Sequence, residues 1–536
     1  MKELRESLGL DKLFALIEAK GELAASVKRH KLARQHVKLS ELKAEYQHCS
    51  LFIDIITHSK PAKAKLEEIF SHFQDLNLSH LKQTECLQVQ ELFEIKNFLW
   101  QYQQMATVLG KQGMNNLHPL PDLSAMFTLL DPDRNGLPTF RISAQYSQHL
   151  ARLLEAQRSS SMRLQKARQQ DLADARQALD MPRLNAEFVL SRNRQEVLTK
   201  LLASKHFIVS NENLANYSFR LADSATALAI KQDLDVLKDK ITEEEANILQ
   251  ELTNEVKTHY KDLETAYQSA GELSWDFYLA EFAQKYDCCI PKLLNSDDKP
   301  FPGIMLKAAV HLPLKLYLED NNRSYQALDL RLEKATNLIT GPNMGGKSTA
   351  LITLGQLCYL ASKGIPLPAK KAELPVYDNI YYNHTSTDNS ENLSSFGKEV
   401  VAFNAALQRK GKTLMLLDEF AKGTNPAEGE ALCAAVIEYL SHTDHTLVAT
   451  THFSAPAKLD GIAHFSIKGI AEKDFARLQK LPDNDMKSRL KLLSEAMDYA
   501  LIPLSGTSQP PQCAIKIATI LGLPADIIKL LGKDYE

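Results

Sequence analysis

The chain carries the sequence Thr340-Gly341-Pro342-Asn343-Met344-Gly345-Gly346-Lys347-Ser348-Thr349. This sequence fits G-x-x-x-x-G-K-[ST], the pattern of a phosphate-binding loop. Its glycines allow the backbone to curl so that successive N–H groups point at a phosphate. Lys347 is expected to reach the β- and γ-phosphates of ATP, and the Ser348 hydroxyl to bind Mg²⁺. We therefore predict that ATP contacts Gly341, Pro342, Asn343, Met344, Gly345, Gly346, Lys347, Ser348 and Thr349.

The flanks of this loop have the patterns that the motif requires. Residues 335–340 are typical of a short buried strand, and residues 348–360 carry apolar side chains at helical spacing. A strand, a glycine-rich turn and a helix in this order place a helix N-terminus at the phosphate. The alternative is a glycine-rich turn that ends in Lys-Ser by chance, and the flanks disfavour it.

Two further predicted strands end in side chains that suit phosphoryl transfer. Residues 413–417 form an apolar run that is followed by Asp418 and Glu419. Asp418 is expected to hold Mg²⁺ directly or through water, and Glu419 to polarise the attacking water. Residues 446–450 lead to His452, which we expect beside the γ-phosphate unless it is an ordinary loop histidine. The predicted catalytic residues are Lys347, Glu419 and His452, and the predicted metal ligands are Ser348 and Asp418.

The composition is that of an ordinary globular protein. Apolar residues make up 44% and charged residues 24% of the 536 residues, a length that suggests three or four domains of about 150 residues. The formal net charge of -3 provides no overall basic field, so any nucleic-acid surface must be local. The N-terminus has no signal-like apolar core, and no apolar run of about 18 residues occurs, which predicts a cytoplasmic protein without membrane contact. Seven scattered cysteines match neither a zinc site nor a disulfide framework.

The region before the phosphate-binding loop is helical in pattern and contains an arm. Residues 144–179 and 226–269 contain no Pro or Gly, which predicts two long helices. Strand-like segments interrupt the helical pattern between them at residues 187–190, 206–209 and 217–221. The chain is therefore expected to run out along one helix, form a small β-containing tip, and return along the other.

A short acidic loop precedes the arm. Residues 131–136 read Asp-Pro-Asp-Arg-Asn-Gly and resemble the first half of a calcium-binding loop. Ile142 stands where such a loop needs a bidentate Glu, and Pro132 is unsuited to a ligand position. We therefore predict no calcium site here.

The arm is where the charge departs from the average. Residues 141–205 contain twelve Lys and Arg against six Asp and Glu, a local charge of +6, which leaves -9 for the rest of the chain. A solvated helix face and a nucleic-acid contact surface explain this excess about equally well. The basic residues near the predicted tip are Arg183, Arg192, Arg194, Lys200 and Lys205.

Several of these motifs together resemble the ATPase of the MutS family, a relative of the ABC-type ATPases. They are the loop at residues 340–349, Leu416-Leu417-Asp418-Glu419, Lys422-Gly423-Thr424 and Thr450-Thr451-His452. The segment Asn392-Leu393-Ser394-Ser395-Phe396-Gly397-Lys398-Glu399 resembles the signature loop of that family, with Gly397 in place of a larger apolar residue. The likeness is close over residues 303–526 and loose over the helical region.

The resemblance implies a multidomain fold, with an α-helical core, long lever helices and a small clamp tip followed by an α/β P-loop (ABC-type) ATPase domain. The expected boundaries are 1–143 for the core, 144–270 for the lever and tip, 271–302 for a connector and 303–536 for the ATPase. The sequence is closest to a short MutS-like branch, without the N-terminal mismatch-recognition domain and without a C-terminal nuclease domain.

The resemblance also implies a dimer, either a homodimer or a heterodimer with a paralogue, in which Ser394 of one subunit completes the ATP site of the other. ATP would join the subunits, so that the arms grip branched or distorted DNA. In the alternative, the arms remodel a protein partner, such as a cobalamin-dependent amino-acid mutase that needs reactivation. A degenerate structural partner is disfavoured, because the predicted catalytic and metal-binding residues are all present.

Overall fold

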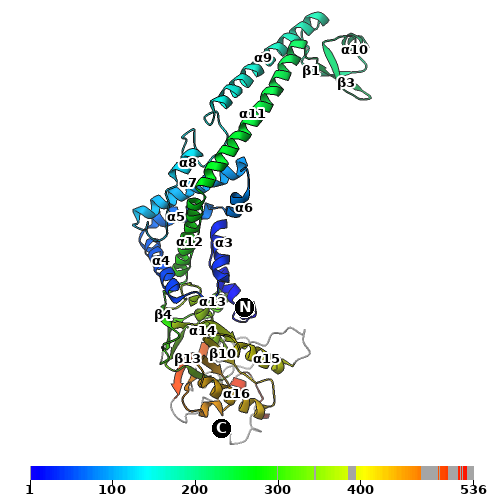
Figure 1. The fold of residues 1–536 in the computed structure, drawn as a ribbon. Coiled ribbons are helices and arrows are strands. Elements are labelled where there is room, and N and C mark those ends of the chain that lie inside the picture. The colour runs from blue at the N-terminus through cyan, green and yellow to red at the C-terminus, as the bar shows by residue number, and fades with distance from the viewer. Residues whose placement is uncertain are drawn as a thin grey trace. The chain divides into compact units, whose positions relative to one another are not determined.

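The structure is a computed structural model (Figure 1). It describes residues 2–298, 300–342, 346–383, 394–471, 493, 495–504, 517–519, 521, 523–524 and 526–527. Asn343, Met344 and Gly345 of the predicted ATP loop lie outside the described residues, as do residues 392 and 393 of the signature segment. The chain forms two compact units, one of Met1–His72 with Gly271–Glu536 and one of Phe73–Ala270.

The unit Phe73–Ala270 is dominated by two long helices, α9 (Gln148–Leu179) and α11 (Ala225–Thr258), which pack along each other (Figure 1). Ser147 and Ser224 precede these helices, and each hydroxyl accepts a hydrogen bond from backbone N–H of the first turn. The shorter helices of this unit are α6 (Leu78–Gln83), α7 (Val89–Lys111) and α8 (Ser124–Leu129).

The first predicted arm helix is confirmed, but the second is shorter than predicted. The sequence over 226–269 predicted one uninterrupted helix, whereas α11 ends at Thr258 and α12 (Tyr260–Lys285) begins two residues later. The N–H of His259 bonds to the Val256 carbonyl, which tightens the last turn of α11. No Pro or Gly marks this helix end, so the local sequence carried no signal for it. The first part of the predicted connector at residues 271–302 belongs to α12, which ends at Lys285.

The tip at the far end of α9 and α11 is a three-stranded antiparallel sheet with the order β1-β3-β2. Its strands are β1 (Glu187–Ser191), β2 (Phe207–Glu212) and β3 (Asn216–Leu221), and its helix is α10 (Gln195–Leu202). A small core of Leu190, Leu201, Phe207 and Phe219 joins them and includes Ala175 of α9. The tip is therefore packed against the arm by its own apolar cluster.

An ion cluster holds the two arm helices together next to the tip. Asp223, just before α11, accepts a hydrogen bond of 3.0 Å from Arg168 of α9 and one of 2.7 Å from Lys231 of α11. The hydrogen bonds from Lys231 and Arg168 lower the pKa of the Asp223 carboxyl. One carboxylate thus contacts both long helices.

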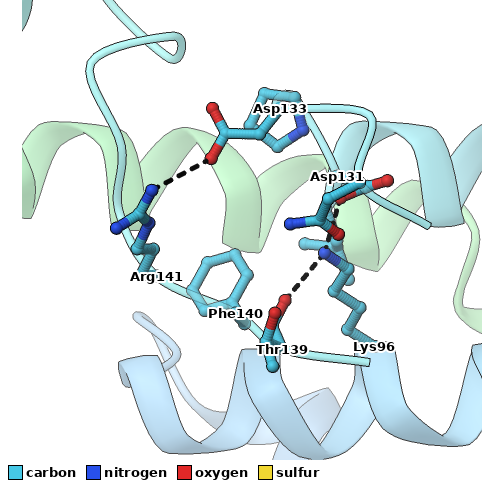
Figure 2. Close-up of a pocket in the computed structure, with 9 residues that line it drawn as sticks. Lys96, Asp131, Asp133, Thr139, Phe140 and Arg141 are labelled. Atoms are coloured by element: carbon cyan, nitrogen blue, oxygen red, sulfur yellow. Dashed lines mark hydrogen bonds and ion pairs between the residues drawn. The ribbon is translucent and has the colours of Figure 1, made fainter. Parts of the chain in front are cut away.

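The acidic loop at residues 131–136 packs against α7 through a buried ion pair. Lys96 of α7 is 2% exposed, and its Nζ donates to Asp131 Oδ1 at 2.9 Å and to the Thr139 carbonyl at 2.8 Å. Figure 2 shows the Lys96 side chain directed at Asp131 and Thr139. The other Asp131 oxygen accepts the Gly136 N–H at 2.9 Å. Both carboxylate oxygens of Asp131 therefore contact protein donors.

In the other unit, short helices precede the sheets in the chain. They are α1 (Lys2–Ser7), α2 (Leu10–Ala15), α3 (Glu22–Ala33), α4 (Leu39–His58) and α5 (Lys60–His72). They pack on one another and on the α12 segment through rings such as Phe52, Phe70 and Phe277. Tyr46 of α4 donates to the Ile365 carbonyl at 2.9 Å, which ties these helices to the nucleotide-binding part of the chain.

The main sheet of this unit has six strands in the order β13-β12-β7-β11-β10-β9. The strands are β7 (Thr336–Thr340), β9 (Asn379–Tyr382), β10 (Thr413–Asp418), β11 (Thr446–Thr450), β12 (Ala463–Ile470) and β13 (Met497–Leu504). All neighbouring pairs are parallel except β12 with β13. Every residue of β7 and β11 is buried, as expected of central strands covered on both faces.

A smaller sheet of the same unit has the order β4-β8-β5-β6. Its strands are β4 (Lys292–Asn295), β5 (Ile304–Ala309), β6 (Leu328–Leu332) and β8 (Lys371–Val376), with α13 (Leu312–Asp320) between β5 and β6. A short 3-10 helix, Pro456–Lys458, follows β11. No helix among the described residues is both long enough and apolar enough to cross a membrane.

Helices cover both faces of the main sheet. On one face, Leu416 of β10 lies against Gly355 of α14 (Lys347–Ala361), where a Cβ atom would come within 2.8 Å of the Leu416 side chain. On the other face, Leu417 packs with Phe403 of α15 (Ser395–Leu407) and with α16 (Pro426–Ser441). Successive strand residues thus face opposite layers. The predicted strand at 335–340 and helix at 348–360 are confirmed as β7 and α14.

Candidate nucleotide site

The phosphate-binding loop joins β7 to α14 at the carboxyl end of the sheet. Gly341 has φ 137° and Gly346 has φ 82°, values that side-chain-bearing residues rarely adopt. A Cβ atom would come within 3.0 Å of Ile467 at Gly341 and of the Tyr499 ring at Gly346. The loop can therefore approach its neighbours this closely only with glycine at both positions. The 15-residue helix α14 follows the loop, and helix N-termini of this kind are suited to binding phosphate groups.

Lys347 is the first residue of α14 and points back into the loop. Its side chain is 5% exposed, and Nζ donates to the carbonyls of Gly341 at 2.9 Å and Pro342 at 3.1 Å. Nζ also lies 3.2 Å from His452 Nε2 and 3.9 Å from Glu419 Oε1. Burial lowers the pKa of Lys347, and the nearby carboxylates of Glu419 and Asp418 act against that shift.

Asp418 is fixed at the end of β10 by neighbouring strands. It stands opposite Thr450 of β11 in the parallel ladder, and the Thr450 hydroxyl donates to Asp418 Oδ1 at 2.6 Å. The Tyr382 hydroxyl donates to Asp418 Oδ2 at 3.2 Å. The Asn383 side chain accepts from the Asp418 N–H and donates to its carbonyl at 3.1 Å. The carboxylate is therefore oriented before any cation binds.

Glu419 follows Asp418 in a left-handed backbone conformation, with φ 52°. Its carboxylate contacts His452 Nε2 at 2.5 Å and the Lys422 ammonium. Burial would raise the pKa of Glu419, but the hydrogen bond from Lys422 and the charges of His452, Lys422 and Lys347 outweigh it and lower the pKa. The carboxylate is thus held ionised, as a general base must be.

His452 is the third member of this cluster. Burial and the adjacent charge of Lys347 lower the pKa of His452, against the opposing influence of Glu419. Lys347, Glu419 and His452 come from three separate segments, and the structure brings them within contact of one another. They lie at the same edge of the sheet because parallel strands end there together.

The other predicted site residues lie around this cluster. Ser348 and Thr349 occupy the first turn of α14, with Ser348 exposed. Ser394 is exposed and caps α15 by accepting the Gly397 N–H at 3.1 Å. Within the described part of the chain, the contacts around Lys347 do not include Ser394.

The sequence did not predict the contacts that four side chains make at this site. Thr450 and Tyr382 orient Asp418, Asn383 ties the end of β9 to the end of β10, and Glu399 contacts that pair. Glu399 lies within the signature segment, and Thr450 within a motif, but neither motif indicated these contacts. Asn383 carried no signal at all, since its partners are 16 and 35 residues away.

The buried Lys347 stands at the start of a helix, after a glycine loop. Beside it, a strand ends at Asp418 and is followed by Glu419. These features define a P-loop nucleotide-binding domain. Residues 337–530 match the family described as MutS domain V. The chain therefore carries a domain that is similar to MutS domain V.

Curated relatives agree with this assignment. The chain is 33% identical over 233 residues to the endonuclease MutS2 of Caldicellulosiruptor bescii, a match that covers 42% of this chain and 28% of the relative. It is 25% identical over 478 residues to the endonuclease MutS2 of Caldanaerobacter subterraneus subsp. tengcongensis, a match that covers 85% of this chain and 57% of the relative. It is 31% identical over 239 residues to the DNA mismatch repair protein MutS of Staphylococcus saprophyticus, a match that covers 43% of this chain and 26% of the relative. The matches thus span from about a quarter to somewhat over half of these relatives.

Proposed function

We propose that this protein hydrolyses ATP and works as a dimeric clamp whose grip on branched or distorted DNA is controlled by that hydrolysis. The observation that carries the ATPase proposal is the contact of Lys347 and His452 with Glu419 beside the glycine loop. These residues supply a cation for phosphate, an ionised general base and a second polar group at one point. The nucleic-acid part of the proposal rests on the relatives and on the charge of the arm.

The geometry supports a chemical role for each of these residues. The loop N–H groups and Lys347 bind the phosphates, and Lys347 leaves its present carbonyl acceptors to do so. Ser348 and Asp418 are the residues that would hold Mg²⁺, which neutralises charge on the phosphates of ATP. Glu419 orients the attacking water and takes its proton, while His452 keeps the Glu419 carboxylate in place.

The dimer part of the proposal rests on Ser394. This residue is exposed at the N-terminus of α15 and makes no contact with the Lys347 cluster of its own subunit among the described residues. An exposed helix N-terminus suits a phosphate. We place Ser394 on the γ-phosphate of the partner, so that ATP joins the two subunits and hydrolysis releases them.

The arm supplies the surface for the load. Arg183, Arg194, Lys200 and Lys205 are exposed at or near the tip. Arg192 differs from them, because it pairs with Glu212 and its guanidinium lies 4.6 Å from the centre of the Tyr217 ring. The relatives named MutS are DNA mismatch repair proteins by that name, which favours DNA as the load.

One observation favours a protein load instead. The tip exposes apolar side chains, with Leu214 99% and Val189 65% exposed. Phosphate contacts do not use such side chains, whereas protein interfaces do. The alternative function is therefore an ATPase that remodels a protein partner.

A salt titration separates the two loads. Reversing Arg194, Lys200 and Lys205 to Glu should remove about three phosphate contacts and flatten the dependence of log K on log salt by about 2.7 for B-form DNA. The matched control reverses three exposed lysines of the other unit, Lys43, Lys60 and Lys410, and should leave the slope unchanged. Wild-type protein that binds no duplex, branched or single-stranded DNA in a salt-dependent way would contradict the DNA load. Capture with the Glu419→Gln variant would then test for a protein partner.

A further inference from the structure

Glu399 lies one turn into α15, on the same helix that begins at the Ser394 cap. Its two carboxylate oxygens accept from different segments: Oε1 from Asn383 Nδ2 at 2.6 Å, and Oε2 from the Ala421 N–H at 3.1 Å. Burial raises the pKa of Glu399, and these two hydrogen bonds act in the opposite direction. Glu399 therefore links α15 to the segments that follow β9 and β10.

The segment after β10 needs such support. Glu419 has φ 52° and Ala421 has φ 62°, so two residues with side chains adopt the left-handed region within three positions. Such residues persist only when their surroundings hold them in place. Between them, Phe420 is 2% exposed and its ring lies 5.2 Å from that of Phe403 on α15.

Ala421 is fully buried and contacts the helices on both sides of it. The carbonyl of Ala421 faces Gly429 of α16, where a Cβ atom would come within 2.6 Å of that oxygen. The N–H of Ala421 bonds to Glu399 on α15. The backbone that sets the direction of the Glu419 side chain is thus held between two helices.

Asn383 extends the link to Asp418. It is 8% exposed, and its side-chain amide pairs with both the N–H and the carbonyl of Asp418 while it donates to Glu399. A movement of α15 that displaced Glu399 would therefore disturb both acids at the end of β10. Ser394 and Glu399 share helix α15, and hydrogen bonds connect Glu399 through Asn383 to Asp418 and directly to Ala421, two residues after Glu419.

We propose that Glu399 is a positioning residue that couples the signature helix α15 to the general base Glu419 of its own subunit. The proposal rests on the proposed function, in which Ser394 binds the nucleotide of the partner. Binding of Ser394 there restrains α15, and Glu399 passes that restraint to Ala421 and hence to Glu419. A subunit then hydrolyses its ATP efficiently only when its partner also holds ATP.

The test is a double-mutant cycle on the full chain with Ser394→Ala, Glu399→Gln and the double variant. Gln has the size of Glu, but its N–H₂ group would face either Asn383 Nδ2 or the Ala421 N–H, which are both donors. One of the two hydrogen bonds to this side chain is therefore lost. We expect kcat to fall by about tenfold in Glu399→Gln, with the Kd of a fluorescent ADP analogue unchanged within about twofold. In Glu399→Ala, kcat should fall further than in Glu399→Gln, with the same Kd. The exposed Asn404→Ala on the same helix is the control, and its kcat and Kd should match those of the wild type. Thermal unfolding of each variant shows whether it is folded.

The double variant distinguishes coupling from independent effects. If Glu399 transmits the binding of Ser394, the double variant should lose about as much kcat as the worse single variant. A loss equal to the product of the two single losses would overturn the proposal, as would an unchanged kcat in folded Glu399→Gln. A wild-type protein that binds ATP without turnover would instead contradict the proposed function itself, and this inference with it.

Discussion

Lys347 Nζ lies 3.2 Å from His452 Nε2, although 105 residues separate them in the sequence. The same histidine nitrogen contacts Glu419 Oε1 at 2.5 Å. One ring nitrogen either donates or accepts, so it cannot serve the ammonium and the carboxylate at once. Movement of Lys347 onto a phosphate would leave Nε2 to donate to Glu419, which would connect nucleotide binding to the state of the proposed general base.

Replacing Lys347 by Ala should abolish ATP hydrolysis and weaken nucleotide binding. In the proposed mechanism the ammonium contacts charge that grows on the transferring phosphoryl group, so its loss should reduce phosphate release by more than about a hundredfold. Steady-state phosphate release is the measurement, with the exposed Lys370→Ala as the control. Release within tenfold of the wild type would contradict the assignment of this loop.

Replacing Glu419 by Gln should separate binding from hydrolysis. The amide keeps the shape of the side chain but cannot take a proton from water. The variant should bind ATP with magnesium and accumulate as a dimer, visible as a larger species in size-exclusion chromatography. The exposed Glu428→Gln on α16 is the matched control. Normal hydrolysis by Glu419→Gln would move the general base elsewhere, with His452 as the next candidate.

Replacing Ser394 by Ala should leave nucleotide binding by the monomer intact, but it should weaken closure and slow hydrolysis to a small residual rate. Mixing this variant with Lys347→Ala should restore one composite site in each mixed dimer, because the intact loop of one subunit meets the intact Ser394 of the other. The recovery should be partial, since the subunit with the intact loop lacks the Ser394 contact through which Glu399 is proposed to act. The measurement is phosphate release as the two variants are titrated against each other. No recovery, with mixed dimers demonstrated, would mean that each subunit hydrolyses ATP alone.

Replacing Lys96 by Met should destabilise the unit Phe73–Ala270 by about 3–5 kcal/mol, because it leaves the Asp131 carboxylate buried without its cation. Adding Asp131→Leu should recover much of that loss, since the double variant buries no unpaired charge. Urea unfolding followed by helical circular dichroism measures both, with the exposed Lys111→Met of α7 as the control. A double variant as unstable as the single one would show that the charge is not the cause.

The Asp223 cluster should make the stability of the arm depend on pH. The pKa of Asp223 is lowered from 3.8 in the folded arm by Lys231 and Arg168, so its stabilisation is present above that value and is lost as the pH falls through the folded pKa. Asp223→Asn should therefore lower the free energy of unfolding at pH 7, measured by urea unfolding, by up to about 1 kcal/mol, and have a smaller effect near pH 3. The exposed Asp239→Asn of α11 should show neither effect. An equal loss from Asp223→Asn at both pH values would contradict the ionic explanation.

Local signals predicted the elements around the nucleotide site well. An apolar run with a sharp glycine turn and a helical repeat placed β7 and α14 within a residue of their observed bounds. The second arm helix was predicted poorly, because its break at His259 involves neither Pro nor Gly. Local sequence patterns indicate which secondary structure a segment favours. The residues around His259 have no such pattern that would end a helix there.

The sequence by itself determined which residues can bind a phosphate, ionise or hold a cation, because the glycines, Lys347, Asp418 and Glu419 are read directly from short motifs. Only the tertiary structure decided which of them meet. Thr450 reaches Asp418 because two strands 32 residues apart pair in parallel, and Glu399 reaches Ala421 because α15 packs over the end of β10. Such contacts depend on strand order and on how helices pack against the sheet, and both are properties of the whole chain rather than of any one segment.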